Sequence, residues 1–284
     1  MSTATPLDLT LLPGARTLLA IHAREAPQRD DLCGAFCGAL ALGAAGLTSV
    51  PDGEGYGGPI DQDAVALAAG SVVGAHTDPA ILPLHETGRR DYRLALPFVE
   101  DSSVSGTTAA GLARAVEELS AGRLAAIPYS APWTPATLDG LFELAAGLER
   151  PVTLLANLAT RHLWGSHPRA EEVLAYLLDG TQSGPPPDWD VGHFACVFGR
   201  LAGPRGSLYG LADTYLSLGT GGVHVQPRER LAAAIERRDR PAGGVLVVVD
   251  AQDAPAVRAG AGGLGLAEGM WDNGTVTSDA VSAP

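Results

Sequence analysis

Residues 28–42 are the stretch around which the chain is arranged, and they read Gln28-Arg29-Asp30-Asp31-Leu32-Cys33-Gly34-Ala35-Phe36-Cys37-Gly38-Ala39-Leu40-Ala41-Leu42. The polar run ends at Cys33, and a helix of small and apolar residues is expected to begin there. At a helix N-terminus, unpaired backbone N–H groups and the positive end of the helix dipole favour a thiolate over a thiol. Cys33 is therefore a candidate nucleophile, and the alternative is a buried structural thiol.

The composition restricts the class of partner. The chain has 284 residues, of which 46% are hydrophobic, and its formal net charge is −13. All 19 basic residues are arginine, which is typical of a GC-rich genome. An acidic chain without lysine clusters is a poor ligand for nucleic acid or for an anionic membrane. We therefore expect neither as a partner.

The cysteine count and the hydropathy pattern indicate the compartment. Three cysteines (Cys33, Cys37 and Cys196) do not form a disulfide framework, and we expect Cys37 and Cys196 to be core residues. The N-terminus carries no signal-peptide pattern, and no apolar run is long enough to span a bilayer. These patterns predict a cytoplasmic protein.

Strand and helix signals alternate along the middle of the chain and favour a mixed α and β fold. Residues 124–129 and 151–157 have the pattern of strands, and each is followed by a helical segment. Thr134 and Pro135 form a helix start signal. A last buried strand is expected at 245–250, and the chain beyond about residue 268 is expected to be frayed.

A hairpin in the C-terminal half supplies chemical partners for Cys33. Residues 189–201 and 207–216 are predicted to be strands joined by a turn near Gly203 and Pro204. Antiparallel pairing about that turn brings His193 opposite Asp213. A carboxylate beside an imidazole fixes the ring tautomer and stabilises the imidazolium. Cysteine, histidine and an orienting acid are the minimum set for thiol nucleophilic catalysis.

Residues 31–40 are similar to the nucleophile motif of the C39-like, papain-fold cysteine peptidases. The run Gly192-His193-Phe194 resembles the catalytic histidine strand of that family, and Asp213 matches its third catalytic member. Gln28 resembles the glutamine that joins the N–H of the nucleophile in the oxyanion hole. The resemblance, which points to an actinobacterial branch of the superfamily, therefore implies Cys33 as nucleophile, His193 as base and acid, Asp213 as orienter and Gln28 as oxyanion donor.

The resemblance implies an α+β, papain-like fold in which a helical part packs on a twisted antiparallel sheet. We expect one such domain over residues 1–267, followed by a flexible tail at 268–284. Cys33 and His193 are 160 residues apart, which is longer than in compact C39 domains. Residues 50–150 are therefore interpreted as an elaboration of the middle of the domain.

The implied activity is acyl transfer through a Cys33 thioester, as in a peptidase or amidase acting on a peptide, amide or thioester substrate. One alternative is an acyltransferase or cyclase of secondary metabolism that acts on a peptide-like or carrier-protein-bound acyl group. Another alternative is a binding protein on a degenerate peptidase fold without catalysis, and the acidic pair Asp30 and Asp31 beside Cys33 is its support.

Four further residues are candidates for the substrate cleft: Gly34, Asn157, Trp164 and Gly192. We predict no cofactor. His162 and His167 lie near Trp164, but two histidines without a third ligand do not make a metal site, so no metal is predicted.

Overall fold

An antiparallel sheet forms the centre of the structure. The computed structural model describes residues 7–50, 57–130 and 132–281. In this part of the chain, the main sheet has seven strands in the order β10-β9-β8-β7-β11-β6, and β1 also pairs with β8. These strands are β1 (Asp8–Leu11), β6 (Leu124–Tyr129), β7 (Thr153–Ala159), β8 (Gly192–Ala202), β9 (Ser207–Ala212), β10 (Val223–Pro227) and β11 (Gly244–Asp250).

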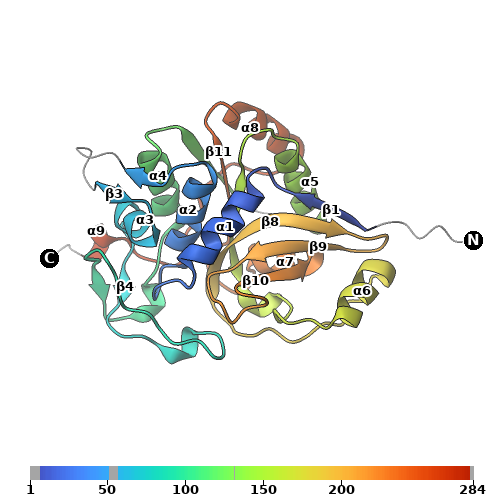
Figure 1. The fold of residues 1–284 in the computed structure, drawn as a ribbon, viewed down its shortest axis with the longest axis horizontal. Helices are drawn as coiled ribbons and strands as arrows, with labels where there is room; N and C mark the ends of the chain where they lie inside the picture. The colour runs from blue at the N-terminus through green and yellow to red at the C-terminus, as the bar shows by residue number, and fades with distance from the viewer. Residues whose placement is uncertain (1–6, 51–56, 131, 282–284) are drawn as a thin grey trace, which may run out of the picture.

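Helices cover both faces of this sheet, as Figure 1 shows. They are α1 (Ala15–Glu25), α2 (Cys33–Ala44), α3 (Gln62–Ala69), α4 (Ala109–Leu119), α5 (Pro135–Ala146), α6 (Ala170–Asp179), α7 (Arg228–Glu236), α8 (Ala254–Gly263) and α9 (Ser278–Val281). Two-stranded pairs form outside the main sheet, β2 (Ser49–Val50) with β3 (Gly58–Pro59) and β4 (Val73–Gly74) with β5 (Phe98–Val99). The predicted α+β class is confirmed.

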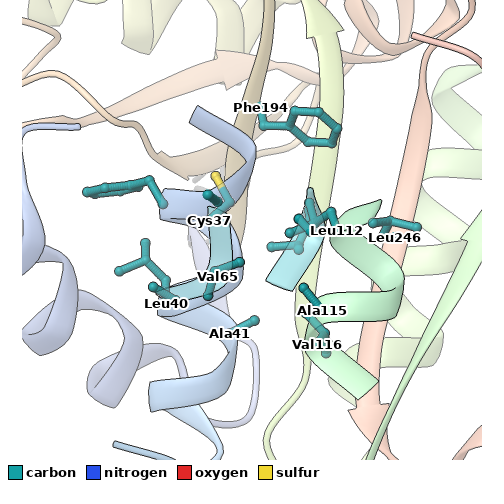
Figure 2. Close-up of a cluster of buried hydrophobic side chains, with 14 of the residues drawn as sticks. Cys37, Leu40, Ala41, Val65, Leu112, Ala115, Val116, Phe194 and Leu246 are labelled. Atoms are coloured by element: carbon teal, nitrogen blue, oxygen red, sulfur yellow. The ribbon is translucent and has the colours of Figure 1, made fainter. Parts of the chain in front are cut away.

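Helix α2 is the buried centre of one face. Every residue of α2 after Cys33 is buried, because α1, α3, α4 and the sheet surround it. Its many glycines and alanines let these neighbours approach closely: a Cβ atom at Gly38 would lie 2.8 Å from both Val65 and Leu112. Figure 2 shows Leu112 and Phe194 packed around this helix, next to Cys37.

The second face carries its own apolar core. Helices α5, α7 and α8 pack there against the strands, and Phe142, Leu141 and Ile235 are among the residues that they bury. Helix α5 begins where the sequence predicts, because Thr134 caps it through Thr137 and Pro135 occupies its first turn. Residues 124–129 and 135–146, from the predicted middle elaboration, thus belong to the main layers of the fold.

The C-terminal segment differs from its predicted frayed state as far as residue 281. Trp271 is buried, and its indole N–H donates to Asn157 Oδ1 at 3.1 Å. Asn273 donates to the carbonyl of Thr107 at 3.1 Å. An indole that is buried and hydrogen-bonded on the sheet holds the segment in place. Of the predicted tail, residues 282–284 lie outside the described residues.

The hairpin register also differs from the prediction. Ala202 pairs with Ser207, so the turn is centred between Pro204 and Arg205. A bulge between Val197 and Gly199 then shifts the pairing, and the ladder ends where Cys196 meets Ala212. The sequence pattern carries no signal for this bulge. Strand β10, which adds to the sheet beyond β9, is absent from the prediction.

No helix among the described residues is both long and apolar enough to cross a membrane.

Two glycine substitutions test the close packing of α4 against α3. A Cβ at Gly111 would lie 2.2 Å from the backbone oxygen of Ala69, whereas a Cβ at Gly262 in α8 meets nothing within 4 Å. We expect Gly111→Ala to lower the free energy of unfolding by about 1–3 kcal/mol. Gly262→Ala should raise it by about 0.5–1 kcal/mol, because alanine restricts the unfolded chain. Urea denaturation measures both, and effects of equal sign would contradict this packing.

Candidate active site

Cys33 begins α2 as predicted, and it is the residue of that helix that is partly exposed. The chain enters the helix through Asp31, whose φ of 64° places it in the left-handed region, and through the buried Leu32. The backbone N–H of Gln28 donates to the carbonyl of Thr214 at 2.8 Å. This hydrogen bond fixes the segment before α2 to the segment that follows β9.

His193 and Asp213 meet in the interior, although by a different register from the predicted one. His193 Nε2 lies 2.7 Å from Asp213 Oδ1, and both side chains are 2% exposed. Asp213 directly follows the last residue of β9, so its carboxylate reaches His193 from the strand end. Because Nε2 binds Asp213, Nδ1 is the ring nitrogen that remains for Cys33, which lines the same cleft and is close enough to raise the pKa of His193.

The charges of this cluster support one another. Burial alone would lower the pKa of His193, but the negative charge and hydrogen bond of Asp213, followed by the influence of Cys33, raise it to about 10. Burial likewise opposes ionisation of Asp213, yet His193 and His224 hold the pKa of this carboxyl well below its usual range. The arrangement therefore favours an imidazolium at His193 beside the carboxylate of Asp213.

A second histidine, His224 on β10, also binds Asp213. Its Nε2 lies 3.0 Å from Asp213 Oδ2, and its Nδ1 lies 3.2 Å from Gln226 Nε2. The Gln226 amide is oriented by the backbone of Trp164, whose N–H donates to Oε1 and whose carbonyl accepts from Nε2. Gln226 must then donate to Nδ1 of His224, so Nε2 of His224 carries the proton that is donated to Asp213. Backbone geometry thus fixes the tautomer of His224.

These residues lie at a cleft of about 330 Å³. Cys33, His193 and Gln28 line it, together with side chains from the 76–82 and 102–107 segments and from the C-terminal segment at 273–275. The ring of Trp189 packs edge-on against His193 with 4.9 Å between centroids, and it also contacts Tyr215 at 5.5 Å. An aromatic ring beside the imidazole limits the access of water to its hydrogen bond with Asp213.

Gln28 is buried at the cleft wall. Its Nε2 donates to the hydroxyl of Tyr215 at 2.9 Å, and its Oε1 has no hydrogen-bond partner among the described residues. If the amide turns by 180°, Tyr215 can donate to Oε1, and the amide N–H groups take the place of the unpartnered oxygen. Gln28 thus lines the cleft with one polar atom of its amide left without a partner among the described residues.

The acidic pair before Cys33 is tied to the 74–91 loop. Asp30 accepts hydrogen bonds from Thr77 and from the backbone N–H of Arg89, the latter at 2.7 Å. Asp31 accepts from the backbone N–H of Gly74 at 2.8 Å, and burial nevertheless raises the pKa of Asp31 above its ordinary value. Both carboxylates thus anchor the loop that forms one wall of the cleft.

The four predicted substrate residues have different positions. Gly192 and Asn157 line the cleft, but the side-chain amide of Asn157 donates a hydrogen bond to the backbone carbonyl of His193 at 3.2 Å. Gly34 is buried in α2, where a Cβ would lie 2.9 Å from Thr107, and it does not line the cleft. Trp164 is also absent from the cleft, because it packs edge-on against Tyr176 in a separate apolar cluster.

Sequence reasoning missed His224, Trp189 and Arg237. The alternation His224-Val225-Gln226 places the two polar side chains on one face of a strand, which was an available signal. Arg237 lines the cleft from the end of α7, and nothing local in the sequence marks it. Among the described residues, no group of three or more His, Cys, Asp or Glu side chains has the arrangement of a metal site.

Comparison with known families identifies one relationship. The model of a family of unknown function, DUF6885, matches residues 12–272. The chain belongs to the DUF6885 family. No protein with a curated description matches it. The matched range contains all the residues of the cluster around Asp213, and it ends just after Trp271.

The His193–Asp213 pair makes the stability of this DUF6885 protein depend on pH. The folded-state pKa of about 10 lies above the ordinary value of 6.5, so the folded state binds the proton more tightly. This stabilisation is complete below about pH 6.5 and is lost as the pH rises toward 10. Denaturation of Cys33→Ala, in which the thiol contributes nothing to the pH profile, should show the loss. The double variant Cys33→Ala/His193→Gln should not lose this stability as the pH rises. Identical profiles of stability against pH in the two proteins would contradict a stabilising His193–Asp213 pair.

Proposed function

We propose that this protein is a cysteine-dependent acyl-transfer enzyme with a papain-like arrangement of its site, as in the C39-like peptidases. The observation that carries the proposal is the placement of His193 between Cys33 and the buried carboxylate of Asp213. A nucleophile, a base and a group that orients the base are then gathered at one site, as thiol catalysis requires. All three lie at or directly behind the cleft wall.

The helix and the sheet contribute different parts of this chemistry. Cys33 stands at the first turn of α2, where backbone N–H groups are unpaired by the helix. His193 stands near the start of the central strand β8, where Leu158 of β7 pairs with it. In a papain-like fold the nucleophile is expected at the start of a helix and the histidine on an antiparallel sheet, which agrees with these positions.

The first half of the proposed reaction forms a thioester. His193 Nδ1 holds the proton of Cys33, and the thiolate attacks the carbonyl carbon of the substrate. The negative charge that develops on the carbonyl oxygen is stabilised by the backbone N–H of Cys33 and by the Gln28 amide. The tetrahedral intermediate then collapses, and the imidazolium gives its proton to the departing amine or thiol.

The second half regenerates the thiol. The acceptor gives a proton to Nδ1 of His193 and attacks the thioester, and the proton then returns to the sulfur of Cys33. Asp213 keeps the ring oriented through both halves, and His224 keeps Asp213 in place. Water as acceptor makes the protein a peptidase or amidase, and an amine makes it an acyltransferase or cyclase.

The cysteines support a reducing compartment as the place of this activity. Cys33, Cys37 and Cys196 are all free, and Cys37 and Cys196 are buried. A free catalytic thiol persists in the cytoplasm, where disulfides are kept reduced. The proposed location is therefore cytoplasmic.

Alkylation by iodoacetamide at pH 7 tests the nucleophile. We expect Cys33 to be modified selectively, because it is partly exposed and lies beside His193, while Cys37 and Cys196 serve as buried internal controls. Peptide mass mapping identifies the modified cysteine.

An activated acyl ester should leave an acyl mass on wild-type protein and none on Cys33→Ala. Release of that mass into water or onto added amines then separates a hydrolase from an acyltransferase. Modification of Cys33 no faster than a free thiol would contradict catalysis and favour a binding protein.

Substitution of Gln28 tests the oxyanion role. Gln28→Ala removes a donor that acts on the transition state, so acylation should slow by about 10²–10³-fold. Alkylation of Cys33 by iodoacetamide should change little, because that reaction forms no oxyanion. The matched control is Gln226→Ala, which lies behind Asp213 rather than at the cleft and should slow both reactions. If Gln28→Ala slowed acylation and alkylation by the same factor, Gln28 would contribute only to packing.

A further inference from the structure

Arg237 is a buried arginine at an unusual backbone position. It ends α7 with φ of 47° and ψ of 48°, the left-handed conformation that helix ends usually assign to glycine. Its exposed fraction is 4%, and it lines the same cleft as Cys33. A side chain with this much desolvated charge needs compensation from a partner.

The protein supplies only part of that compensation. Nη1 of Arg237 donates to Asn157 Oδ1 at 2.5 Å, and Asn157 is itself held by Trp271 and by the backbone of His193. Nε of Arg237 is buried and has no hydrogen-bond partner among the described residues. Its neighbour Arg240 is paired with Asp190, whereas no carboxylate of the described residues pairs with Arg237.

The unused edge of Arg237 has the geometry that binds carboxylates elsewhere in this protein. Arg89 holds Asp91 through Nε and Nη2 at 3.1 and 2.8 Å, and Arg93 holds Asp61 through the same two atoms. Asn157 occupies Nη1 of Arg237, which leaves the Nε and Nη2 edge. Two parallel N–H groups on one edge match the two oxygens of a carboxylate.

The guanidinium of Arg237 lies at the cleft beside Gly192, the first residue of β8. A Cβ atom at Gly192 would lie 3.0 Å from Nη2 of Arg237, and Gly192 is exposed at the cleft. Gly192 directly precedes His193, so Arg237 lies one residue from the proposed base. Asp30, Asp31 and Asp78 also line the cleft, from the segment before Cys33 and from the 76–82 segment.

We propose that the substrate of Cys33 carries a carboxylate close to its reacting carbonyl group and that Arg237 binds this carboxylate through Nε and Nη2. This inference rests on the proposed acyl-transfer function and names its substrate class, a small peptide-like acyl compound with a free carboxylate. Phosphate offers the same charge, but the planar two-atom edge of one guanidinium favours a carboxylate.

The protonation state of Arg237 agrees with this role. Burial, reinforced by the charge of Arg240, lowers the pKa of Arg237 to about 10, so the side chain remains a cation at neutral pH. A bound carboxylate would offset the cost of burying that cation. In a chain of net charge −13, this local cation also counteracts the repulsion of an anionic substrate.

Two alkylating reagents test the inference. Iodoacetate and iodoacetamide both lose iodide to a thiolate, and they differ only in a carboxylate against a carboxamide. The rate constants at Cys33 are measured at pH 7 by intact mass. The rate constant for iodoacetate divided by that for iodoacetamide should fall about tenfold or more in Arg237→Gln, because a charge-assisted hydrogen bond is lost. In Arg237→Lys the same ratio should fall less. Arg238→Gln is the matched control, since Arg238 is exposed at the next position, and it should keep the wild-type ratio.

A binding measurement separates the two proposals. N-acetylglycine, its primary amide and inorganic phosphate are titrated by calorimetry into Cys33→Ala and Cys33→Ala/Arg237→Gln. Binding of N-acetylglycine alone, lost in the double variant, supports the inference whether or not Cys33 reacts. An unchanged reagent ratio in a folded Arg237→Gln protein overturns the inference and leaves acyl transfer intact. Equal binding of phosphate overturns the assignment of a carboxylate. Failure of both reagents to label Cys33 overturns the acyl-transfer proposal.

Discussion

The buried carboxylate of Asp213 is the interaction on which the rest of the site depends. An unpaired carboxylate in this position would cost several kcal/mol, so every one of its hydrogen bonds must form together. Its partners come from separate elements: His193 on β8, His224 on β10 and the backbone N–H of Thr214 at 2.7 Å. The carboxylate therefore fixes the positions of both strands relative to the end of β9. A slip of either strand would take away one of these three donors.

The same requirement extends to the N-terminal half of the chain. Nε2 of His22 on α1 contacts the backbone oxygen of Asp213 at 2.5 Å, and Gln28 is bonded through its N–H to Thr214. These contacts hold α1 and the start of α2 against the segment that carries the carboxylate. Cys33 is thus placed beside His193 by backbone hydrogen bonds that involve neither of the two side chains. The position of the sulfur follows from the position of the charge.

Local signals in the sequence were enough to predict the elements that carry the site. The polar-to-apolar change at Cys33 predicts the start of α2, and the start signal of Thr134 and Pro135 marks α5. The meeting of His193 with Asp213 was also predicted, because a two-residue error in register still leaves a histidine within reach of a strand end. The error begins at the turn, which lies about one residue later in the chain than predicted, and the bulge reduces it by one residue. That bulge depends on tertiary packing, because Gly210 leaves no room for a Cβ atom beside Phe198. No local pattern reports such a contact.

Residues that reach the site from distant elements were beyond sequence reasoning. Arg237 and Trp271 acquire their roles only because α7 and the C-terminal segment pack around Asn157. Gly34 and Trp164 belong to recognisable motifs, yet helix packing and a separate apolar cluster take them away from the cleft. Adjacency in sequence to Cys33, or to a histidine, is therefore a weak guide to which side chains form the walls.

The order of the chain has a consequence for biosynthesis. Cys33 leaves the ribosome 160 residues before His193, and the carboxylate and His224 follow later still. At 5–20 residues per second this delay is roughly 10–30 s. During that time the nascent chain carries a cysteine without an imidazole beside it, and without the sheet that buries the rest of its helix. The sulfur thus acquires its final surroundings only late in translation, after the strands of the C-terminal half have been made.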